Sequence, residues 1–411
     1  MAGPLEGIRA VEWAGFGAGP LIGVILGDFG ADVIKIEQRG VGEPLRGMRP
    51  TDVGGRQVPS GINPAVENTS RSKRSISLDL KKDKGKQIMY QLVKKADVFY
   101  TNFGQTRAKE LGVDYEKLSR LNPRLVYANS TGMGAKGPYA NKRAYDPAAQ
   151  ARSAMMMSLG ERDTAPSSMI GAPVDTTAAT LTAFGIVTAL LARERTGIGQ
   201  MTNTSLLHSA IWLQVLNIQT GLFRVGTRKH IGMRRRLRTK PENPMDHQPV
   251  QCRDGKWLML AEPQFDRFWV EFCRIMGIRK PEYLNLNMQV LREGYNTEPL
   301  ASFLDGLFAT KPRDEWIKIF EENDARFGYA PVNEVDDLLY DPQVLSNNYF
   351  VDFDHPIAGP IKYVTTPIQF SKTPAKVKSS APGYGQHTEE ILLELDYSLD
   401  DIAKLKQEEV I

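Results

Sequence analysis

The sequence is poor in the residues that build disulfide frameworks and metal sites. Among 411 residues there are two cysteines, Cys252 and Cys273, with no CxxC pair, and five histidines without HxxxH or HExxH spacing. So sparse a set favours neither a disulfide framework nor a metal centre. We therefore expect a protein without a bound metal ion.

Signals for binding a membrane or a nucleic acid are also lacking. The opening MAGPLEGIRAVEW has no basic region followed by an apolar one, and the apolar segment from Thr176 to Ala192 is too short and too threonine-rich to predict a bilayer span. The net charge of +4 is mild and comes without an RNA-binding or helix-turn-helix signature. We expect a cytoplasmic protein with no nucleic-acid or membrane partner.

What the sequence does contain is one carboxylate directly in front of a long apolar helix. Residues 176–192 carry no charge, and large apolar residues recur at helical spacing, so the helix is predicted to be buried nearly all round. The large residues are Leu181, Phe184, Val187 and Leu191. Asp175 precedes them. It has two interpretations: an N-cap that stabilises the helix by about 1 kcal/mol, or a nucleophile able to open a thioester.

The first 40 residues predict a strand–helix–strand unit over residues 8–37. Its turn, GFGAGP, resembles a dinucleotide fingerprint, and Glu37 falls near the distance of a ribose-binding acid. Pro20 stands in place of the last glycine, which weakens a dehydrogenase interpretation. Gly17 and Ala18 would still let backbone N–H groups approach a phosphate at a helix start, and the alternative is a tight turn without a ligand.

Two clusters of cations have an ordinary and a functional interpretation. Arg71, Lys73 and Arg74 precede an alternating strand and are either solvated charge or phosphate ligands. Seven cations between Arg228 and Lys240 form either a solvated linker or a site for the second carboxylate of a dicarboxylic substrate.

Several motifs resemble the family III coenzyme A transferases, the formyl-CoA and carnitine-CoA transferase type also called CaiB/BaiF. They are GAPVD with Asp175, then ALLARERTGIGQ, SLLHSA and APGYGQHTEEILLEL, and the similarity extends from Gly3 to Ile411. The resemblance implies that Asp175 carries the acyl group as an anhydride and then coenzyme A as a thioester. Acyl-CoA thioesters and carboxylic acids would be substrates, with no permanently bound cofactor.

The resemblance also implies which residues contact the substrates. The implied coenzyme A contacts are Phe16, Gly17, Ala18, Gln38, Arg39, Lys73, Arg74, Asn102, Phe103 and Arg143, and the implied acyl-pocket residues are Tyr145 and Asp146. Two positions depart from the pattern, because Gln38 and Glu110 stand where relatives often have arginine. Tyr145 also stands where the related 2-methylacyl-CoA racemases have a catalytic histidine, which disfavours racemisation.

The fold implied is α/β, with a Rossmann-like large domain built from N- and C-terminal segments and a smaller α/β domain inserted between them. The expected boundaries are 1–225 for the first part of the large domain, 226–335 for the linker and small domain, and 336–411 for the return. Relatives form interlocked dimers, so we expect a homodimer or a heteromer with a related subunit. A racemase-like enzyme and a non-catalytic subunit are the alternatives, and neither donor nor acceptor acid is specified.

Overall fold

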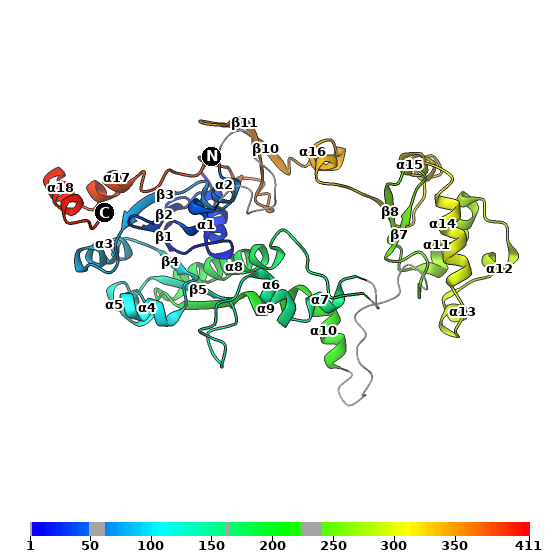
Figure 1. Ribbon diagram of the computed structural model, residues 1–411, viewed down its shortest axis with the longest axis horizontal. Helices are drawn as coiled ribbons and strands as arrows, with labels where there is room; N and C mark the ends of the chain where they lie inside the picture. The colour runs from blue at the N-terminus through cyan, green and yellow to red at the C-terminus, as the bar shows by residue number, and fades with distance from the viewer. Residues whose placement is uncertain (1, 49–61, 161–163, 224–240) are drawn as a thin grey trace. The chain divides into compact units, whose positions relative to one another are not determined.

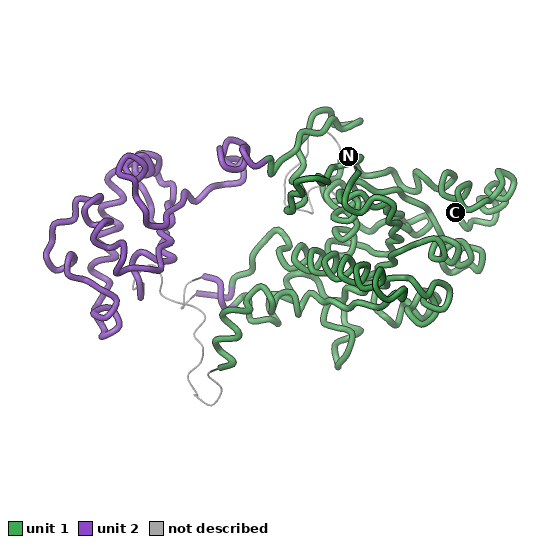
Figure 2. Tube along the Cα trace, turned by 180° about the vertical axis from the view of Figure 1, so that it is seen from behind, with its two compact units in different colours: residues 1–156, 167–228, 348–411 green, residues 157–166, 229–347 purple. Residues whose placement is uncertain are grey.

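The computed structural model describes residues 2–48, 62–160, 164–223 and 241–411. The chain forms two compact units (Figure 2). Unit 1 contains Met1–Met156, Ser167–Arg228 and Asn348–Ile411, and unit 2 contains Met157–Pro166 and Lys229–Asn347. The main insertion thus begins near residue 229, against the predicted 226, and ends near residue 347, against the predicted 335.

Unit 1 is built on one parallel sheet of six strands with the order β3-β2-β1-β4-β5-β6 (Figure 1). The strands are β1 (Arg9–Trp13), β2 (Asp32–Gln38), β3 (Arg74–Leu78), β4 (Val98–Thr101), β5 (Val126–Thr131) and β6 (Met201–Ser205). This is the doubly wound Rossmann order, in which the chain reverses its direction of travel between β1 and β4. The predicted strand–helix–strand unit is confirmed as β1, α1 (Ala18–Asp28) and β2.

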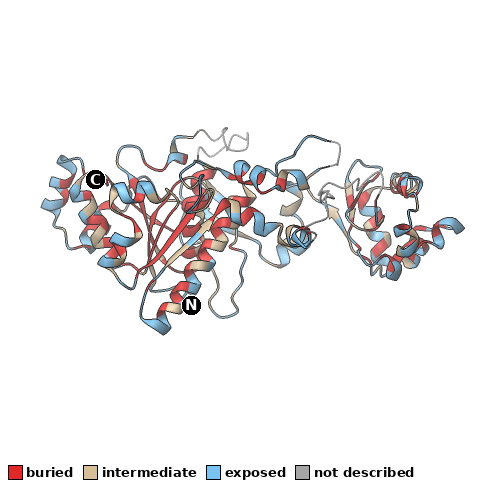
Figure 3. Ribbon diagram, turned by 90° about the horizontal axis from the view of Figure 1, so that it is seen from below, coloured by how far each residue is buried: buried red, intermediate tan, exposed pale blue. Residues whose placement is uncertain are grey.

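Helices cover both faces of this sheet, and β1 to β5 are buried along almost their whole length, whereas the edge strand β6 is largely half-buried (Figure 3). α1 and α8 (Pro173–Thr196) pack on one face, against Ala10, Val33, Tyr100 and Val126. The other face is covered by α3 (Asp83–Lys94), α4 (Gln105–Leu111), α5 (Tyr115–Leu121), α17 (Thr388–Glu394) and α18 (Leu399–Gln407). The remaining elements of this region are η1 (Pro44–Gly47), α2 (Pro64–Ser70), α6 (Asp146–Arg152), α7 (Met155–Ser158), α9 (Leu206–Leu213), α10 (Val215–Leu222), β10 (Phe350–His355) and β11 (Gly359–Val364).

The last segment of the chain completes the sheet face begun by the first. Ile391, Leu392 and Leu405 belong to the same hydrophobic cluster as Val11 and Ile34 in the first two strands. At the end of β3, the Asp79 backbone N–H donates to the carbonyl oxygen of Val410 at 2.8 Å. The N- and C-terminal segments therefore share one core.

Unit 2 has a three-stranded antiparallel sheet in the order β7-β8-β9, formed by β7 (Gln248–Gln251), β8 (Trp257–Leu260) and β9 (Tyr329–Val332). β7 and β8 form an antiparallel hairpin whose turn contains Asp254 and Gly255. Its aromatic core includes Trp269, which stacks on Phe265 with ring centroids 4.8 Å apart. The helical elements here are α11 (Phe265–Met276), α12 (Pro281–Leu284), α13 (Met288–Arg292), α14 (Glu298–Phe308), α15 (Arg313–Glu322), η3 (Asp336–Leu339) and α16 (Pro342–Ser346).

The prediction that α8 is buried nearly all round is wrong for unit 1. Its small residues, among them Ala179, Thr182 and Ala183, are buried, whereas Phe184 is 70% and Leu191 55% exposed on unit 1. Ile186 and Leu190 are buried with these small residues against the sheet, while the other large residues lie on the opposite side. With 24 residues α8 is also longer than predicted, and by length and composition it could cross a membrane, although 44% of its apolar window is buried inside the protein.

Candidate active site

Asp175 lies in the first turn of α8 and is not its N-cap. The helix begins at Pro173, and the capping position is held by Ala172, whose backbone is left-handed with φ 54°. The interpretation of Asp175 as a capping residue is therefore wrong. Its carboxylate instead lines a pocket at the surface of unit 1.

The capping role belongs to Asp146, the first residue of α6. Asp146 Oδ2 accepts hydrogen bonds from the backbone N–H of Val174 at 2.7 Å and of Asp175 at 3.0 Å. Gln150 Nε2 donates to the Oδ1 atom of the same carboxylate. Asp146 is only 4% exposed, so the prediction that it lines the acyl pocket is corrected: it holds the helix turn that carries Asp175.

The environment of Asp175 raises the pKa of its carboxyl group to about 6. Burial is the larger cause, because desolvation disfavours the charged form, and the nearby carboxylate of Asp146 adds a smaller repulsion. The group is still mostly ionised at neutral pH. A carboxylate that is partly desolvated yet charged is suited to nucleophilic attack.

The turn after β1 lies directly on Asp175. A Cβ atom added at Gly17 would overlap Asp175 Oδ2 and would lie 3.1 Å from Asp175 Cγ. Any larger residue at this position would force the Asp175 carboxylate to move. Phe16, the preceding residue, has a left-handed backbone with φ 63°, and its ring packs edge-on against Tyr145 with centroids 5.4 Å apart.

Asp175 opens into a pocket of about 640 Å³ at the carboxyl ends of the central strands. Segments that follow β1, β4 and β5 line it, which is the edge of the sheet where doubly wound folds bind their ligands. The pocket brings together most of the site residues predicted from sequence: Phe16, Gly17, Ala18, Asn102, Phe103, Arg143, Tyr145 and Asp175. Segments as distant in the chain as residues 16 and 175 therefore meet at one site.

Three of the cations predicted to bind coenzyme A lie elsewhere. Lys73 is buried, and its ammonium donates to Glu12 Oε2 at 2.7 Å and to two backbone carbonyl oxygens, which uses all three of its N–H groups. Arg74 begins β3, at the opposite end of the sheet from the pocket, and pairs with Asp32 at 2.6 Å. The Arg39 side chain donates to the carbonyl oxygen of Ile411 at 3.0 Å. The predictions for Lys73 and Arg74 are thus wrong, and Arg39 faces the chain end.

Glu37, the residue that a dehydrogenase would need to bind a ribose, has other partners. Glu37 is buried, and its carboxylate accepts two hydrogen bonds from Arg46 at 2.7 Å and one from the Ser75 hydroxyl. It is therefore occupied and unavailable to a ribose.

Within the ranges that the structure describes, no three histidine, cysteine, aspartate or glutamate side chains group as metal ligands would. The basic segment from Arg228 to Lys240, predicted to be either a solvated linker or a carboxylate site, lies entirely outside the described residues.

CoA-transferase family III matches residues 5–388, which is most of the chain. The chain belongs to this family. A succinate–glutarate CoA-transferase of Agrobacterium fabrum is 33% identical over 405 residues, covering 96% of each chain. An (R)-2-hydroxy-4-methylpentanoate CoA-transferase of Clostridioides difficile is 29% identical, covering 99% of each. A solved CaiB/BaiF family protein from Brucella suis is 28% identical, with a TM-score of 0.80 over 96% of this chain and all of that one.

This family III CoA-transferase also has pocket cations that motif reasoning missed. Arg107 lines both the Asp175 pocket and a second one of about 170 Å³, and its guanidinium lies 4.7 Å from the centre of the Phe103 ring. Gln38 lines the second pocket together with Lys81. Lys81 follows the carboxyl end of β3. The lysine that lines a pocket therefore comes after this strand, whereas Lys73 and Arg74 stand at its start. That end was predictable in principle, because ligands of parallel sheets bind beyond the carboxyl ends of the strands.

Proposed function

We propose that this CoA-transferase moves coenzyme A from an acyl-CoA donor to a carboxylic acid through covalent intermediates on Asp175. The observation that carries the proposal is the placement of Asp175. It is a partly desolvated carboxylate on the first turn of a helix, facing a pocket at the edge of the sheet where ligands bind.

The first half of the reaction loads the enzyme. An Asp175 carboxylate oxygen attacks the donor thioester carbonyl, the C–S bond breaks, and coenzyme A leaves as a thiolate. The product is a mixed anhydride of Asp175 and the donor acid. The thiolate then attacks Asp175 Cγ and displaces the donor carboxylate, so that Asp175 holds coenzyme A as a thioester.

The second half reverses these steps with a new acid. The acceptor carboxylate attacks Asp175 Cγ and releases the thiolate, which forms a second anhydride. The thiolate attacks the acceptor carbonyl and frees the Asp175 carboxylate. One thioester replaces another, so the exchange balances without ATP, oxidant or metal.

We place coenzyme A across the two adjoining pockets. Both are lined by Pro44, Phe103 and Arg107, so a long ligand could extend from one into the other. Arg107 and Arg143 supply positive charge for phosphates, and the exposed part of Phe103 offers an aromatic face. Gly17 and Ala18, at the N-terminus of α1, add backbone N–H groups on the Asp175 side.

The relatives and the exposed surface of α8 also suggest a donor substrate and an oligomeric state. Relatives named as succinate–glutarate and succinyl-CoA:glutarate CoA-transferases make succinyl-CoA the first donor to examine. We propose a cytoplasmic dimer, in line with the interlocked pairs expected of the family. The exposed apolar residues Phe184, Val187 and Leu191 on α8 support a covered surface there.

The test is to trap the intermediates. Protein incubated with succinyl-CoA, and separately with acetyl-CoA, is treated with hydroxylamine, and the peptide containing Asp175 is weighed by mass spectrometry. We expect inactivation and a hydroxamate on Asp175 alone. Asp175→Asn should fold and bind coenzyme A but lose turnover by several orders of magnitude, since an amide is not a nucleophile of this kind.

Two outcomes would count against the proposal. Turnover by Asp175→Asn at the rate of the parent protein would remove Asp175 from the mechanism. Exchange of the α-hydrogen of a chiral 2-methylacyl-CoA in deuterated water, at a rate comparable with transfer, would point to the racemase alternative instead. A panel of carboxylic acids with each donor then identifies the acceptor.

A further inference from the structure

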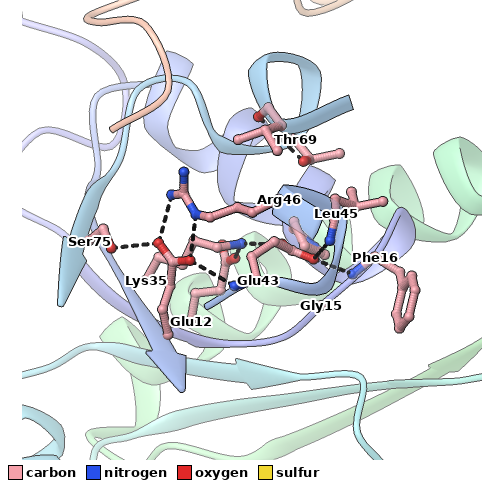
Figure 4. Close-up of polar contacts among 12 residues, drawn as sticks. Glu12, Gly15, Phe16, Lys35, Glu43, Leu45, Arg46, Thr69 and Ser75 are labelled. Carbon is pink, nitrogen blue, oxygen red and sulfur yellow. Dashed lines mark hydrogen bonds and ion pairs between the residues drawn. The ribbon is translucent and has the colours of Figure 1, made fainter. Parts of the chain in front are cut away.

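We propose that Glu43 is a positioning residue for Asp175: its buried carboxylate holds the backbone of Phe16 and so fixes Gly17 against the reacting aspartate. The kinetic part of this inference rests on the proposed function of Asp175. Glu43 Oε1 accepts a hydrogen bond from the Phe16 backbone N–H at 2.9 Å and another from Leu45 (Figure 4). The Phe16 ring points away from these contacts.

Phe16 needs such a contact because of its backbone. A left-handed conformation at a residue with a side chain costs about 1–2 kcal/mol and persists only where the surroundings impose it. Asn102 holds the neighbouring Gly15 from the other side, accepting from its N–H at 3.0 Å and donating to its carbonyl oxygen at 2.8 Å. Glu43 and Asn102 thus clamp the turn that ends at Gly17.

Glu43 is itself fixed by a buried chain of charges. Lys35 donates to Glu43 Oε2 at 2.8 Å and to Glu12 Oε1 at 2.9 Å, and these three side chains are buried. Lys73 and the Tyr100 hydroxyl complete the chain by donating to Glu12. Although burial alone lowers it, the pKa of Lys35 is held above its usual value by the two carboxylates.

Buried ion pairs of this kind usually add little to the free energy of unfolding compared with apolar residues in the same place. Replacing a buried ion pair by well-packed apolar residues is often neutral or stabilising, whereas removing one partner is strongly destabilising. What the charges supply here is a rigid acceptor at a defined place, 2.9 Å from the Phe16 N–H. Through the ring contact of Phe16 with Tyr145, the same acceptor also sets one wall of the pocket.

The first test compares two substitutions at Glu43 with a matched control. Glu43→Leu removes the acceptor, and Glu43→Gln keeps an oxygen that can accept from Phe16. The control is Asp28→Asn, because Asp28 is also a buried carboxylate, ends α1 at its other terminus and pairs with Arg71 at 3.0 Å. All variants are measured at a temperature at which circular dichroism shows them folded.

We expect Glu43→Leu to lower kcat at least about tenfold while the Kd for coenzyme A changes less than about threefold, since misplacing a reacting group by even 1 Å is costly. Glu43→Gln should recover most of that loss, and Asp28→Asn should stay within about twofold of the parent. Equal losses in the leucine and glutamine variants, or an equal loss in Asp28→Asn, would overturn the proposal. Should Glu43→Leu not fold, Glu43→Asp takes its place, because its shorter side chain cannot reach both Lys35 and Phe16.

The second test does not depend on turnover. A water-soluble carbodiimide with an amine labels exposed carboxyl groups, and mass spectrometry of the peptide gives the rate at Asp175. Release of Gly17 in Glu43→Leu should raise this rate at least about threefold, with no change in Asp28→Asn. An unchanged rate in a folded Glu43→Leu would refute the positioning role, even if the parent protein proved to transfer no coenzyme A.

Discussion

Asp146 Oδ2 accepts hydrogen bonds from the backbone N–H groups of both Val174 and Asp175, so one carboxylate caps the helix turn that carries the other. The two carboxylates therefore oppose each other electrostatically while being tied together by the backbone. This arrangement adds to the raised pKa of Asp175. The capping role of Asp146 can therefore be tested by stability measurements, separately from the reaction at Asp175.

Removing the cap should cost stability. We expect Asp146→Ala to lower the free energy of unfolding by about 2 kcal/mol, because it leaves two N–H groups without their acceptor. Asp146→Asn keeps an acceptor oxygen but loses the charge, so it should cost less and should lower the pKa of Asp175. Urea denaturation and the acidic limb of the pH–rate profile measure the two effects. A larger stability loss in the asparagine variant than in the alanine variant would contradict the capping role.

The activity should depend on pH through Asp175. Because the nucleophile is the ionised form, kcat/KM should fall as the pH drops through about 6, near the raised pKa of Asp175. The decline should approach tenfold per pH unit below that value. A profile that stays flat down to pH 5 would be inconsistent with an elevated pKa at a reacting carboxylate.

Stability should change with pH in the opposite sense. The folded state holds a proton on Asp175 up to about pH 6, whereas the ordinary value is 3.8, so this residue's contribution to the free energy of unfolding falls as pH rises through that window. Asp175→Asn should therefore be more stable than the parent by about 1–3 kcal/mol at pH 7. The difference should disappear near pH 4. Thermal melts of the two proteins across this range provide the measurement.

The close approach of Gly17 predicts a steric variant. Gly17 has φ −81°, which alanine tolerates, but the added Cβ would overlap the Asp175 carboxylate. Gly17→Ala should thus keep the fold and lose about 10- to 100-fold in kcat. Gly47→Ala is the control, because Gly47 is exposed and a Cβ there meets no atom within 4 Å. Equal activities in the two variants would show that the carboxylate can move aside freely.

The exposed apolar residues of α8, Phe184, Val187 and Leu191, allow the proposed dimer interface to be tested with a charged substitution. Phe184→Asp should convert a dimer to a monomer if α8 lies in the interface, because an uncompensated charge there would be desolvated. Leu399→Asp is the control, since Leu399 is 67% exposed and Phe184 70%. Size-exclusion chromatography with light scattering gives the mass. A dimer that survives Phe184→Asp would place the interface elsewhere.

Sequence reasoning was accurate where a pattern is local and failed where it depends on packing. The strand–helix–strand unit over residues 8–37 could be predicted because apolar periodicity and a glycine turn specify it. The burial of α8 could not, because apolar residues lie on all of its faces and only packing against the sheet decides that Ala179 and Ile186 face inward while Phe184 faces outward. Asp146 was misassigned for a related reason: its partners lie 28 and 29 positions away.

The cations show the same limit. Lys73 and Arg74 stand in a basic run that resembles a phosphate site, yet one is buried against Glu12 and the other begins its strand. The sequence places charges along a chain but does not state which end of a strand faces the ligand. Applying the rule for the carboxyl ends of parallel strands to β3 would have favoured Lys81, which the structure places in the second pocket.

The shared core of the first and last segments affects how the protein is made. Residues 388–411 supply Ile391, Leu392, Leu405 and Val410 to a cluster that otherwise belongs to the first half of the chain. They leave the ribosome after unit 2 has been synthesised. Until then the nascent chain carries an unfinished hydrophobic surface on its sheet, which is the condition under which chaperones are engaged and premature termination is most damaging.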